Sequence, residues 1–324
     1  MNDKLIGKKV LVTGATGLIG QALVRELLRQ GVHVLAAVRN IKKAERTFRD
    51  TEHIEFIVSD ITEIANDEYG IDYIIHAASI TASAAFVQDP VGVIQVALSG
   101  TQRVLEIAKT NHVESMVYLS SMEVYGTPET DEKISELHST NLNTMVLRSS
   151  YPESKRMCES LCAAYWSQYG VPVKVVRLTQ TFGPGVQYED GRVFAEFARC
   201  AIENRDIILH TKGETKRSYL HIDDAVSAIL TVLLKGSDGE AYNAANEESY
   251  CSIYEMARLV ADKCAEGRIK VRIEEKKDLL KFGYAPTLHM NLDTAKLKQL
   301  GWKAERPLKE TYQSMIDDMK TNHR

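Results

Sequence analysis

The chain has 324 residues, which is enough for one large domain or two medium-sized domains with a full hydrophobic core. Its formal net charge is −4 and charged residues make up 26% of it, so we expect no nucleic-acid partner. No apolar run approaches the roughly 20 residues of a membrane helix, and the N-terminus shows no signal-like apolar segment. We therefore expect a cytoplasmic protein without a membrane partner.

The five cysteines are scattered along the chain, and none of them forms a Cys-x-x-Cys pair. Cys158 and Cys162 have the spacing to share one face of a helix, but two thiols alone make a poor metal site. We expect reduced thiols, which fit a cytoplasmic setting, and no metal.

The first half of the chain alternates between apolar runs and helical patterns. Residues 10–13 form an apolar run that stops at Gly14, and an amphipathic pattern follows over residues 18–30. Further strand-like runs lie at residues 34–38, 54–58, 73–78, 116–119 and 173–178. Helical patterns over residues 92–110 and 153–169 separate several of them. This alternation predicts an α/β fold with a doubly wound parallel sheet that is covered on both faces.

The alternation of strand and helix patterns stops after Leu178, and glycine and proline cluster at residues 183–185. Short strands are expected at residues 207–210, 218–221 and 270–274, and helices at residues 193–203, 223–234, 252–265, 293–300 and 307–319. We predict a first domain of residues 1–178, joined by part of residues 222–246, and a smaller, mixed and discontinuous second domain within residues 179–324.

The segment between the first expected strand and helix reads Gly-x-x-Gly-x-x-Gly. Glycines there allow a tight turn, and the N-terminus of the helix offers N–H groups and a positive dipole to a pyrophosphate. We therefore predict a dinucleotide cofactor on this segment. The predicted contacts are Gly14, Thr16, Gly17, Leu18, Ile19 and Gly20.

The next strand ends contain candidates for the rest of a dinucleotide site. An NAD site usually has an acid at the end of the second strand, but this chain has Arg39 there, which suits the 2′-phosphate of NADP. NADP is thus favoured over NAD; the alternative is that Arg39 stacks on adenine or is solvated. Asp60 and Ile61 follow the third strand, where Asp60 either meets the adenine or caps a turn. Ala77 and Ala78 are small enough for a cofactor to lie close.

A third group of residues has the chemistry of an acid/base centre. Tyr151 and Lys155 are four residues apart at the start of an expected helix and therefore share one of its faces. A nearby ammonium favours the phenolate form of a tyrosine, so Tyr151 is a candidate acid/base. Ser121 and Glu123 follow the strand at residues 116–119 and are expected to join this face.

With its glycine pattern, Ser-x-Glu-Val-Tyr-Gly and Tyr-x-x-x-Lys in this order, the chain resembles the extended short-chain dehydrogenase/reductases, and within them the nucleotide-sugar epimerase/dehydratase family. The resemblance runs from about residue 8 to residue 312. It implies a Rossmann domain with a small C-terminal domain for a nucleotide-diphosphate sugar, a tightly bound NAD(P), a 4-keto sugar intermediate and a homodimer.

The resemblance also implies roles for the catalytic candidates. Tyr151 would deprotonate the sugar C4 hydroxyl, Lys155 would bind the nicotinamide ribose, and Ser121 would hold the C4 oxygen. Glu123 is typical of the family's dehydratases and decarboxylases, because a carboxylate can take the C5 proton that a C4 ketone acidifies. Met122 stands where 4,6-dehydratases carry an aspartate, which disfavours a standard 4,6-dehydratase.

Segments further along resemble the UDP-glucuronate decarboxylases of this family, in particular residues 148–156, 190–193 and 216–219. They imply substrate contacts from Arg192, Val193 and Arg217, because a guanidinium reads a diphosphate or a carboxylate; solvated charges are the alternative for the arginines. The chain departs from the family with Ala97 and Gln180 in place of asparagines and with Phe182 in place of a tyrosine. Gln180 is still expected to contact substrate.

Three hypotheses follow for the reaction. The first is a nucleotide-sugar lyase, of decarboxylase or dehydratase type, with Glu123 as its second acid/base. The second is a nucleotide-sugar 4-epimerase, which needs only Ser121, Tyr151 and Lys155. The third is an NADPH-dependent ketoreductase, which Arg39 favours and the sugar-nucleotide segments disfavour.

Overall fold

The computed structural model describes residues 4–49, 51–276 and 287–322. Its largest feature is a seven-stranded sheet in which every pairing is parallel, with the strand order β10-β6-β5-β4-β1-β2-β3. The strands are β1 (Lys9–Thr13), β2 (His33–Val38), β3 (Ile54–Val58), β4 (Tyr73–His76), β5 (Ser115–Ser121), β6 (Val173–Leu178) and β10 (Ala241–Ala244).

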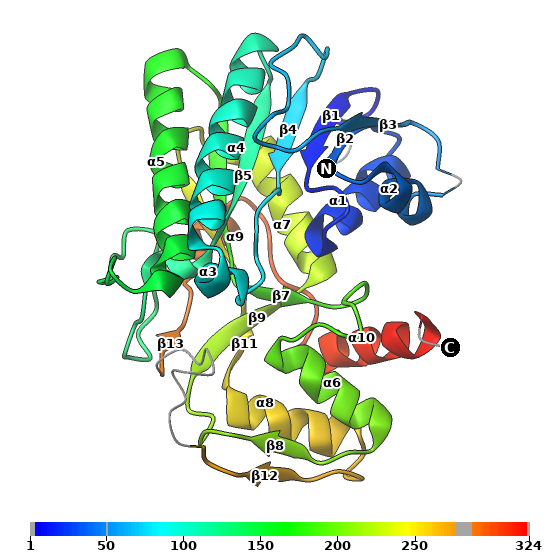
Figure 1. The fold of residues 1–324 in the computed structure, drawn as a ribbon, viewed down its shortest axis with the longest axis vertical. Helices are drawn as coiled ribbons and strands as arrows, with labels where there is room; N and C mark the ends of the chain where they lie inside the picture. Colours follow the sequence, from blue (N-terminus) through cyan, green and yellow to red (C-terminus); the bar gives the residue numbers. More distant parts are fainter. Residues whose placement is uncertain (1–3, 50, 277–286, 323–324) are drawn as a thin grey trace.

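Helices cover both faces of this sheet, which Figure 1 shows as three layers. One face carries α1 (Leu18–Arg29) and α7 (Ile222–Lys235), and the other carries α4 (Pro90–Thr110) and α5 (Ser150–Tyr169). Side chains alternate along β5, so that Val117 packs toward α1 and α7 while Met116 packs toward α4 and α5. The predicted doubly wound Rossmann sheet is confirmed.

A smaller lobe lies beyond the carboxyl ends of these strands (Figure 1). Its strands are β7 (Gln180–Phe182), β8 (Ile207–Leu209), β9 (Lys216–His221), β11 (Asn246–Ser252), β12 (Val271–Ile273) and β13 (His289–Met290). Its helices are α6 (Val193–Glu203), α8 (Ile253–Leu259), which continues as a π-helix over Val260–Cys264, and α10 (Leu308–Asn322).

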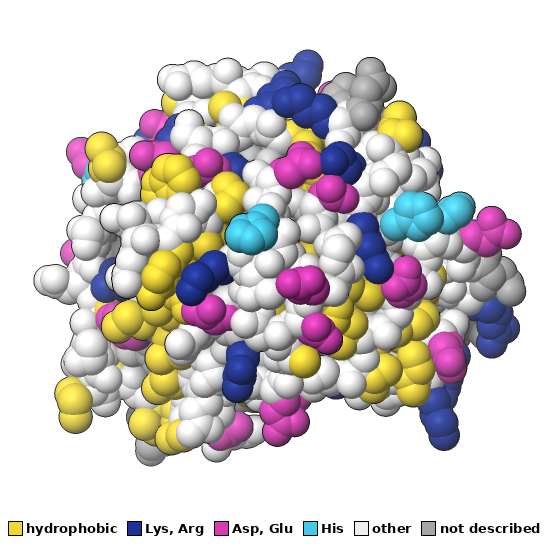
Figure 2. Space-filling model, turned by 90° about the horizontal axis from the view of Figure 1, so that it is seen from above, with side chains coloured by type: hydrophobic (Ala, Val, Ile, Leu, Met, Phe, Trp, Pro, Cys, Tyr) yellow, Lys and Arg dark blue, Asp and Glu magenta, His cyan; other side chains and the backbone are white. Residues whose placement is uncertain are grey.

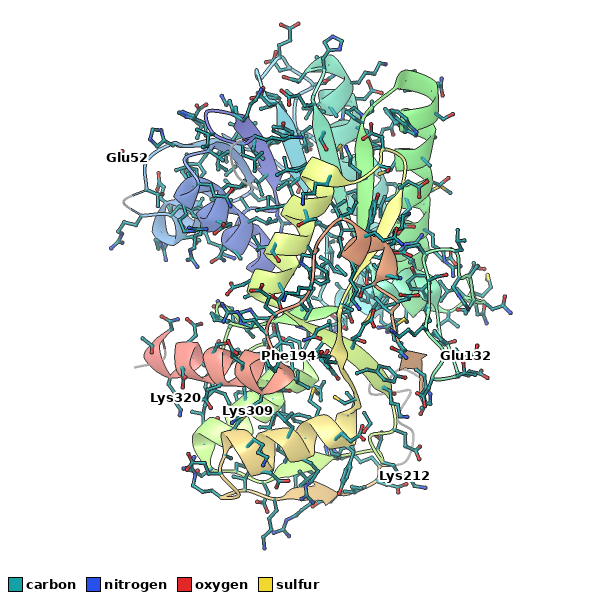
Figure 3. All side chains as sticks on the ribbon, turned by 180° about the vertical axis from the view of Figure 1, so that it is seen from behind. Glu52, Glu132, Phe194, Lys212, Lys309 and Lys320 are labelled. Atoms are coloured by element: carbon teal, nitrogen blue, oxygen red, sulfur yellow. The ribbon has the colours of Figure 1, made fainter. Side chains whose placement is uncertain are left out.

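The smaller lobe has a hydrophobic core of its own. Phe182 stacks on Phe194 with ring centroids 4.5 Å apart, and Tyr219 and Tyr312 meet Phe182 edge-on. Figure 3 shows Phe194 from behind, on the side of α6 that faces α10. These aromatic contacts hold α6 and α10 against β7 and β9, beside the carboxyl ends of the large sheet.

Several short elements were not expected from the sequence. They include α2 (Ile41–Thr47), α3 (Ala85–Gln88) and the strands β7, β11 and β13. The helix expected over residues 293–300 is present as the shorter α9 (Ala295–Gln299). β11 reads Asn-Glu-Glu-Ser-Tyr-Cys-Ser, without apolar alternation, and its pairing with β9 contains a register shift. Such strands form because a neighbouring strand offers hydrogen bonds, which no local pattern predicts.

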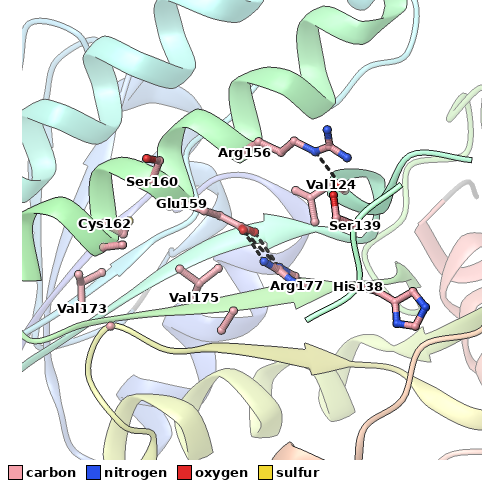
Figure 4. Close-up of a pocket in the computed structure, with 13 residues that line it drawn as sticks. Val124, His138, Ser139, Arg156, Glu159, Ser160, Cys162, Val173, Val175 and Arg177 are labelled. Atoms are coloured by element: carbon pink, nitrogen blue, oxygen red, sulfur yellow. Dashed lines mark hydrogen bonds and ion pairs between the residues drawn. The ribbon is translucent and has the colours of Figure 1, made fainter. Parts of the chain in front are cut away.

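A polar network beside the carboxyl end of β5 joins the sheet to the middle of α5. Arg177 on β6 makes an ion pair with Glu159 on α5, with Nη2 and Oε2 2.7 Å apart, and both side chains are largely buried. Arg177 also donates to the hydroxyl of Tyr125, which donates to Asn243 on β10. The pair lines a pocket of about 410 Å³ beside α5 and the sheet edge, where Figure 4 shows Glu159 and Arg177 facing each other.

Replacing Glu159 with glutamine should lower the free energy of unfolding by about 3 kcal/mol, because the buried Arg177 guanidinium would lose its countercharge. Urea denaturation followed by circular dichroism measures the loss. The matched control is Asp262→Asn, which breaks the exposed pair with Arg258 and should cost about 0.5 kcal/mol or less. Equal effects of the two variants would contradict a structural role for the buried pair.

Charges of both signs are mixed on the end of the molecule that Figure 2 shows. This view looks down on the end where α4 and α5 finish, and acidic and basic side chains are interspersed across it. None of the helices within the described ranges combines the length and the hydrophobicity that crossing a membrane requires.

Candidate active site

The glycine segment forms a tight turn between β1 and α1. Gly14 has φ +66°, and a Cβ at this position would lie 2.8 Å from the backbone of Ala78, which follows β4. A Cβ on Gly20 would collide with the carbonyl oxygen of Gly14. Both glycines are therefore required by close backbone approach and, at Gly14, by a left-handed conformation.

The N-terminus of α1 fits a bound pyrophosphate. Gly17 is the N-cap residue and has no side chain to bond the first-turn N–H groups, and this turn contains no acidic residue. The N–H groups of a first helical turn lack intrahelical partners and attract anions. Leu18 and Ile19 form that turn, and the carbonyl of Thr16 beside it accepts from Gln21 at 2.9 Å.

Replacing Gly20 with alanine should lower the free energy of unfolding by about 1–3 kcal/mol, because the new methyl group has no space against Gly14. The same change should weaken cofactor binding by opening the turn. Thermal melting and fluorescence titration with NADH and NADPH measure the two effects. Gly191→Ala is the matched control, because a Cβ there meets nothing within 4 Å. A Gly20→Ala protein that melts and binds like the control would show that the turn tolerates a side chain.

The adenosine end of the predicted cofactor site contains two opposite charges. Arg39 is exposed directly after β2, and Asp60 follows the neighbouring β3. Asp60 accepts from the backbone N–H and the hydroxyl of Thr62, at 3.0 and 2.8 Å. These bonds, with a smaller contribution from the Arg39 charge, lower the pKa of Asp60. Asp60 thus fixes the turn after β3, and Arg39 keeps its guanidinium in solvent. The neighbouring Ile61 is buried against α4, where Gly100 gives it room.

The end of β4 is closed by hydrogen bonds. His76 meets the hydroxyl of Thr13 at 2.7 Å through Nδ1 and that of Thr101 at 3.2 Å through Nε2. Burial lowers the pKa of His76 to about 3, so this histidine is neutral and both its ring nitrogens are satisfied. Thr13 also accepts from the backbone N–H of Ala78 at 3.1 Å, which holds Ala77 and Ala78 beside the glycine turn.

Tyr151 lies in the first turn of α5, where it is buried beneath an aromatic neighbour. Its ring stacks on Phe86 of α3, with centroids 4.3 Å apart and an interplanar angle of 9°. Ser121 is the last residue of β5, and its hydroxyl accepts from the backbone N–H of Glu123 at 3.2 Å. A hydrogen bond between Tyr151 and Ser121 acts to lower the pKa of the phenol. The two hydroxyl groups predicted to act on one oxygen therefore lie together.

Lys155 is one turn further along α5. Its ammonium donates to the carbonyl of Leu119 at 2.7 Å and lies 5.8 Å from the centre of the Tyr151 ring. Burial lowers the pKa of Lys155 to about 8. In the protein alone, burial and the charge of Glu123 raise the pKa of Tyr151. This direction is opposite to the one expected from the Tyr-x-x-x-Lys spacing, because burial outweighs the opposing contributions and Lys155 bonds a carbonyl.

Glu123 sits in a short 3₁₀ turn, Met122–Tyr125, directly after β5. Its carboxylate forms a two-pronged ion pair with Arg148, with distances of 2.9 Å from Nη1 to Oε2 and 3.1 Å from Nη2 to Oε1. The Glu123 charge contributes to the pKa of Tyr151, so the carboxylate lies within electrostatic reach of the phenol. The sequence placed Glu123 at this site but gave no sign of its pairing with Arg148.

Apart from Ser121, the predicted substrate residues lie on the smaller lobe and are held by local bonds. Gln180 at the start of β7 accepts from Arg217 of β9 at 3.2 Å, while the buried Nε of Arg217 has no partner among the described residues. Arg192 caps α6 beside Val193, and its guanidinium pairs with Asp190 at 2.9 Å. Buried guanidinium N–H groups require acceptors, which an anionic ligand supplies.

Comparison with known proteins decides the family. Residues 10–245 match the model of the NAD dependent epimerase/dehydratase family. The chain belongs to this family. The resemblance read from the motifs is thereby confirmed, and the protein is an enzyme of the NAD-dependent epimerase/dehydratase type.

Individual members of the family differ in their reactions. UDP-glucuronic acid decarboxylase 1 of Xenopus tropicalis is 30% identical over 310 residues, which cover 94% of this chain and 70% of that protein. Human dTDP-D-glucose 4,6-dehydratase is 28% identical over 97% of this chain and 91% of its own length. The structure of UDP-glucuronic acid 4-epimerase from Bacillus cereus with UDP-glucuronic acid and NAD has a TM-score of 0.82 at 21% identity, over 97% of this chain and 99% of that one, which shows a shared fold.

Proposed function

We propose that this family member is a nucleotide-sugar lyase that works through a 4-keto sugar, with Glu123 as the acid/base of its second step. The observation that carries the proposal is the position of Glu123, in the 3₁₀ turn directly after β5, where its backbone N–H donates to the Ser121 hydroxyl at 3.2 Å. A 4-epimerase has no use for a second base at this point. The relatives named as decarboxylases and as a dehydratase support the same class.

The chain's own groups divide the chemistry between two steps. Tyr151 takes the proton of the sugar C4 hydroxyl, while Ser121 holds the C4 oxygen by a hydrogen bond. The nicotinamide cofactor, when bound, accepts a hydride from C4. Lys155, beside the Tyr151 ring, holds the nicotinamide ribose and supplies positive charge. In the 4-keto uronate the bond from C5 to the carboxylate carbon then breaks, carbon dioxide leaves, and the electron pair of that bond stays in the enolate. Glu123 relays a proton to C5 of this enolate, and the hydride is then returned to C4.

Met122 favours decarboxylation over loss of water. Its side chain is buried, and its sulfur accepts a hydrogen bond from Thr179 at 3.3 Å. A thioether donates no proton, so this position offers no acid to a leaving hydroxyl. Loss of carbon dioxide from a 4-keto uronate needs no such acid, so we propose a nucleoside-diphosphate uronate as the substrate class.

A 4-epimerase is the second candidate, because Ser121, Tyr151 and Lys155 suffice for it and Met122 is compatible with it. A net NADPH-dependent ketoreductase is the third, motivated by Arg39 alone. Incubation with UDP-, dTDP-, GDP- and CDP-sugars followed by product mass spectrometry separates the three. Loss of carbon dioxide or water supports the lyase. An unchanged mass with an altered NMR pattern supports the epimerase, and consumption of NADPH in proportion to product supports the reductase.

We propose NADP as the preferred cofactor and NAD as the alternative. The exposed guanidinium of Arg39, at the end of β2, is suited to a 2′-phosphate and has no acidic group to offer a ribose diol. Arg39→Asp should weaken NADP binding by about 10- to 100-fold, the size of a lost charged hydrogen bond, and should improve NAD binding. Cofactor identity is read by mass spectrometry after release from the purified protein. Recovery of NAD alone from the unaltered protein would reject the preference.

The substrate is proposed to lie between the two lobes, with Arg217, Gln180, Arg192 and Val193 on the smaller lobe facing its diphosphate or its sugar. The division into a cofactor domain of residues 1–178 with part of 222–246, and a substrate domain within 179–324, follows from this arrangement. The part of residues 222–246 assigned to the cofactor domain includes β10, which extends the large sheet beside β6. Exchange of Arg217 for methionine should raise KM for the nucleotide sugar and leave cofactor binding unchanged.

We also propose a homodimer formed through α4 and α5. These helices pack against each other on one face of the sheet (Figure 1), and several apolar side chains on them are exposed. Val91, Ile94 and Met157 are 63, 40 and 53% exposed. Light scattering after size exclusion tests the proposal, since Ile94→Asp together with Met157→Asp should leave a monomer.

A further inference from the structure

The strongest feature that the proposed reaction does not explain is the pairing of Glu123 with Arg148. Arg148 belongs to the short 3₁₀ helix Leu147–Ser149 that leads into α5, so its backbone is set three residues before Tyr151. Its guanidinium donates a hydrogen bond to each oxygen of the Glu123 carboxylate, at 2.9 and 3.1 Å. A two-pronged bond of this kind fixes the plane of the carboxylate as well as its position.

The pair is tied to Tyr151 through a second contact. The Arg148 guanidinium carbon lies 5.8 Å from the centre of the Phe86 ring, and Phe86 stacks on the Tyr151 ring at 4.3 Å. Arg148 is thus positioned by Glu123 on one side and by the aromatic ring that covers Tyr151 on the other. The side chains of Arg148 and Glu123 are 33 and 24% exposed, so neither is a freely solvated surface charge.

The two charges act on the phenol in opposite directions. Glu123 raises the pKa of Tyr151, and Arg148 lowers it. The other ionisable groups beside this phenol are Lys155, on the next turn of α5, and Tyr118, on β5, whose hydroxyl is buried. Removing either partner of the ion pair therefore leaves an uncompensated charge close to the group that starts the reaction.

We propose that Arg148 is a positioning residue that orients the Glu123 carboxylate for the second step and cancels its charge at Tyr151 during the first step. This inference rests on the proposed function for the role of Glu123 in the second step. Its electrostatic half concerns only the hydride step, which the lyase and the epimerase have in common. The Arg148 guanidinium thus has two proposed functions. Its charge offsets the charge of Glu123 at Tyr151, and its two-pronged geometry orients the Glu123 carboxylate. A substitution that keeps the charge but removes the fork separates the two.

Four variants of the full-length holoenzyme test the proposal: Arg148→Met, Arg148→Lys, Glu123→Gln and the double variant Glu123→Gln/Arg148→Met. Arg25→Met, an exposed arginine on α1, is the matched control. Two quantities are measured for each with the nucleotide sugar on which the unaltered enzyme is most active. They are the pH profile of cofactor reduction in a single turnover, followed by nicotinamide absorbance, and the rate of product formation by mass spectrometry. Circular dichroism and thermal melting identify any variant that does not fold.

The expected results follow from the sign of each charge. Cofactor reduction requires Tyr151 as a base, so a higher pKa of Tyr151 moves the acid limb of the profile to higher pH. Arg148→Met should move this limb up by about one pH unit, Glu123→Gln should move it down, and the double variant should return it near that of the unaltered enzyme. Arg148→Lys should keep the limb in place and still slow product formation about tenfold, because lysine restores the charge without the fork.

Other outcomes overturn the proposal. If Arg148→Met leaves the acid limb of the pH profile where it is, Arg148 does not compensate Glu123. The same conclusion follows if both single variants move the limb in the same direction and the double variant moves it by the sum of the two shifts. A rise in KM with no change in the limb would make Arg148 a substrate contact instead. Failure of the proposed function is read separately: an unchanged substrate mass in the unaltered enzyme rejects the lyase, while the limb comparison still decides the electrostatic half. No cofactor reduction with any nucleotide sugar would reject both.

Discussion

Replacing Tyr151 with phenylalanine should slow reduction of the bound cofactor by about 10²- to 10⁴-fold, which is the range that positioned acid/base groups contribute. The variant removes one oxygen and keeps the ring, so the stack on Phe86 and the start of α5 should persist. Stopped-flow absorbance of the nicotinamide after mixing with substrate measures the rate. Thermal melting should show an unchanged fold.

The matched control for this prediction is Tyr169→Phe at the other end of α5. Its hydroxyl accepts a hydrogen bond only from the neighbouring Gln168 among the described residues, and the side chain is 46% exposed. This control should reduce its cofactor at the original rate. If the Tyr151→Phe enzyme kept more than about a tenth of the original rate, another group would have to be the base, because loss of the base costs at least about 10²-fold.

Replacing Glu123 with glutamine should separate the two halves of the reaction. Cofactor reduction should continue, because it depends on Tyr151, Ser121 and Lys155, whereas product formation should fall by about 10²- to 10⁴-fold. Reduced cofactor and the 4-keto sugar should then accumulate on the enzyme. Absorbance of the reduced nicotinamide and quenched-flow mass spectrometry follow the two species.

Glu153→Gln is the control for that experiment. Glu153 lies on α5 near Tyr151 and pairs with Arg156 at 3.5 Å, so its loss removes a nearby negative charge without touching the predicted site. It should leave product formation unchanged. Normal turnover by Glu123→Gln would remove Glu123 from the mechanism and favour the 4-epimerase.

The large sheet was predictable because buried parallel strands have a local signature. Val10–Val12 and Met116–Leu119 are continuous apolar runs, since both faces of each strand are covered, and Gly14 and Gly31 mark where strand and helix end. The smaller lobe was less predictable. β11 is polar and β7 spans only three residues, so neither has a strand pattern of its own. Both are strands because they pair with β9. A non-local cause of this kind leaves no mark in the surrounding sequence.

The same distinction applies to the site. The Tyr151–Lys155 spacing and the glycine turn are local patterns, and the structure places these residues at the carboxyl ends of β1, β4 and β5. The Arg148–Glu123 pair joins residues 25 positions apart, and the Phe86 stack comes from a helix of four residues. Neither contact has a periodicity to detect. Burial and the Glu123 charge raise the pKa of Tyr151, and neither can be read from the Tyr-x-x-x-Lys spacing, so the direction expected from that spacing was wrong.

The most direct test of a 4-keto mechanism is transient absorbance of the reduced nicotinamide while the holoenzyme turns over a nucleoside-diphosphate uronate. If C4 is oxidised first, with Tyr151 as the base, and is reduced again later, the absorbance of the reduced nicotinamide should rise and then decay as carbon dioxide appears. No added reductant should be consumed. Product formed without any reduced cofactor, or reduced cofactor required in proportion to product, would contradict the mechanism.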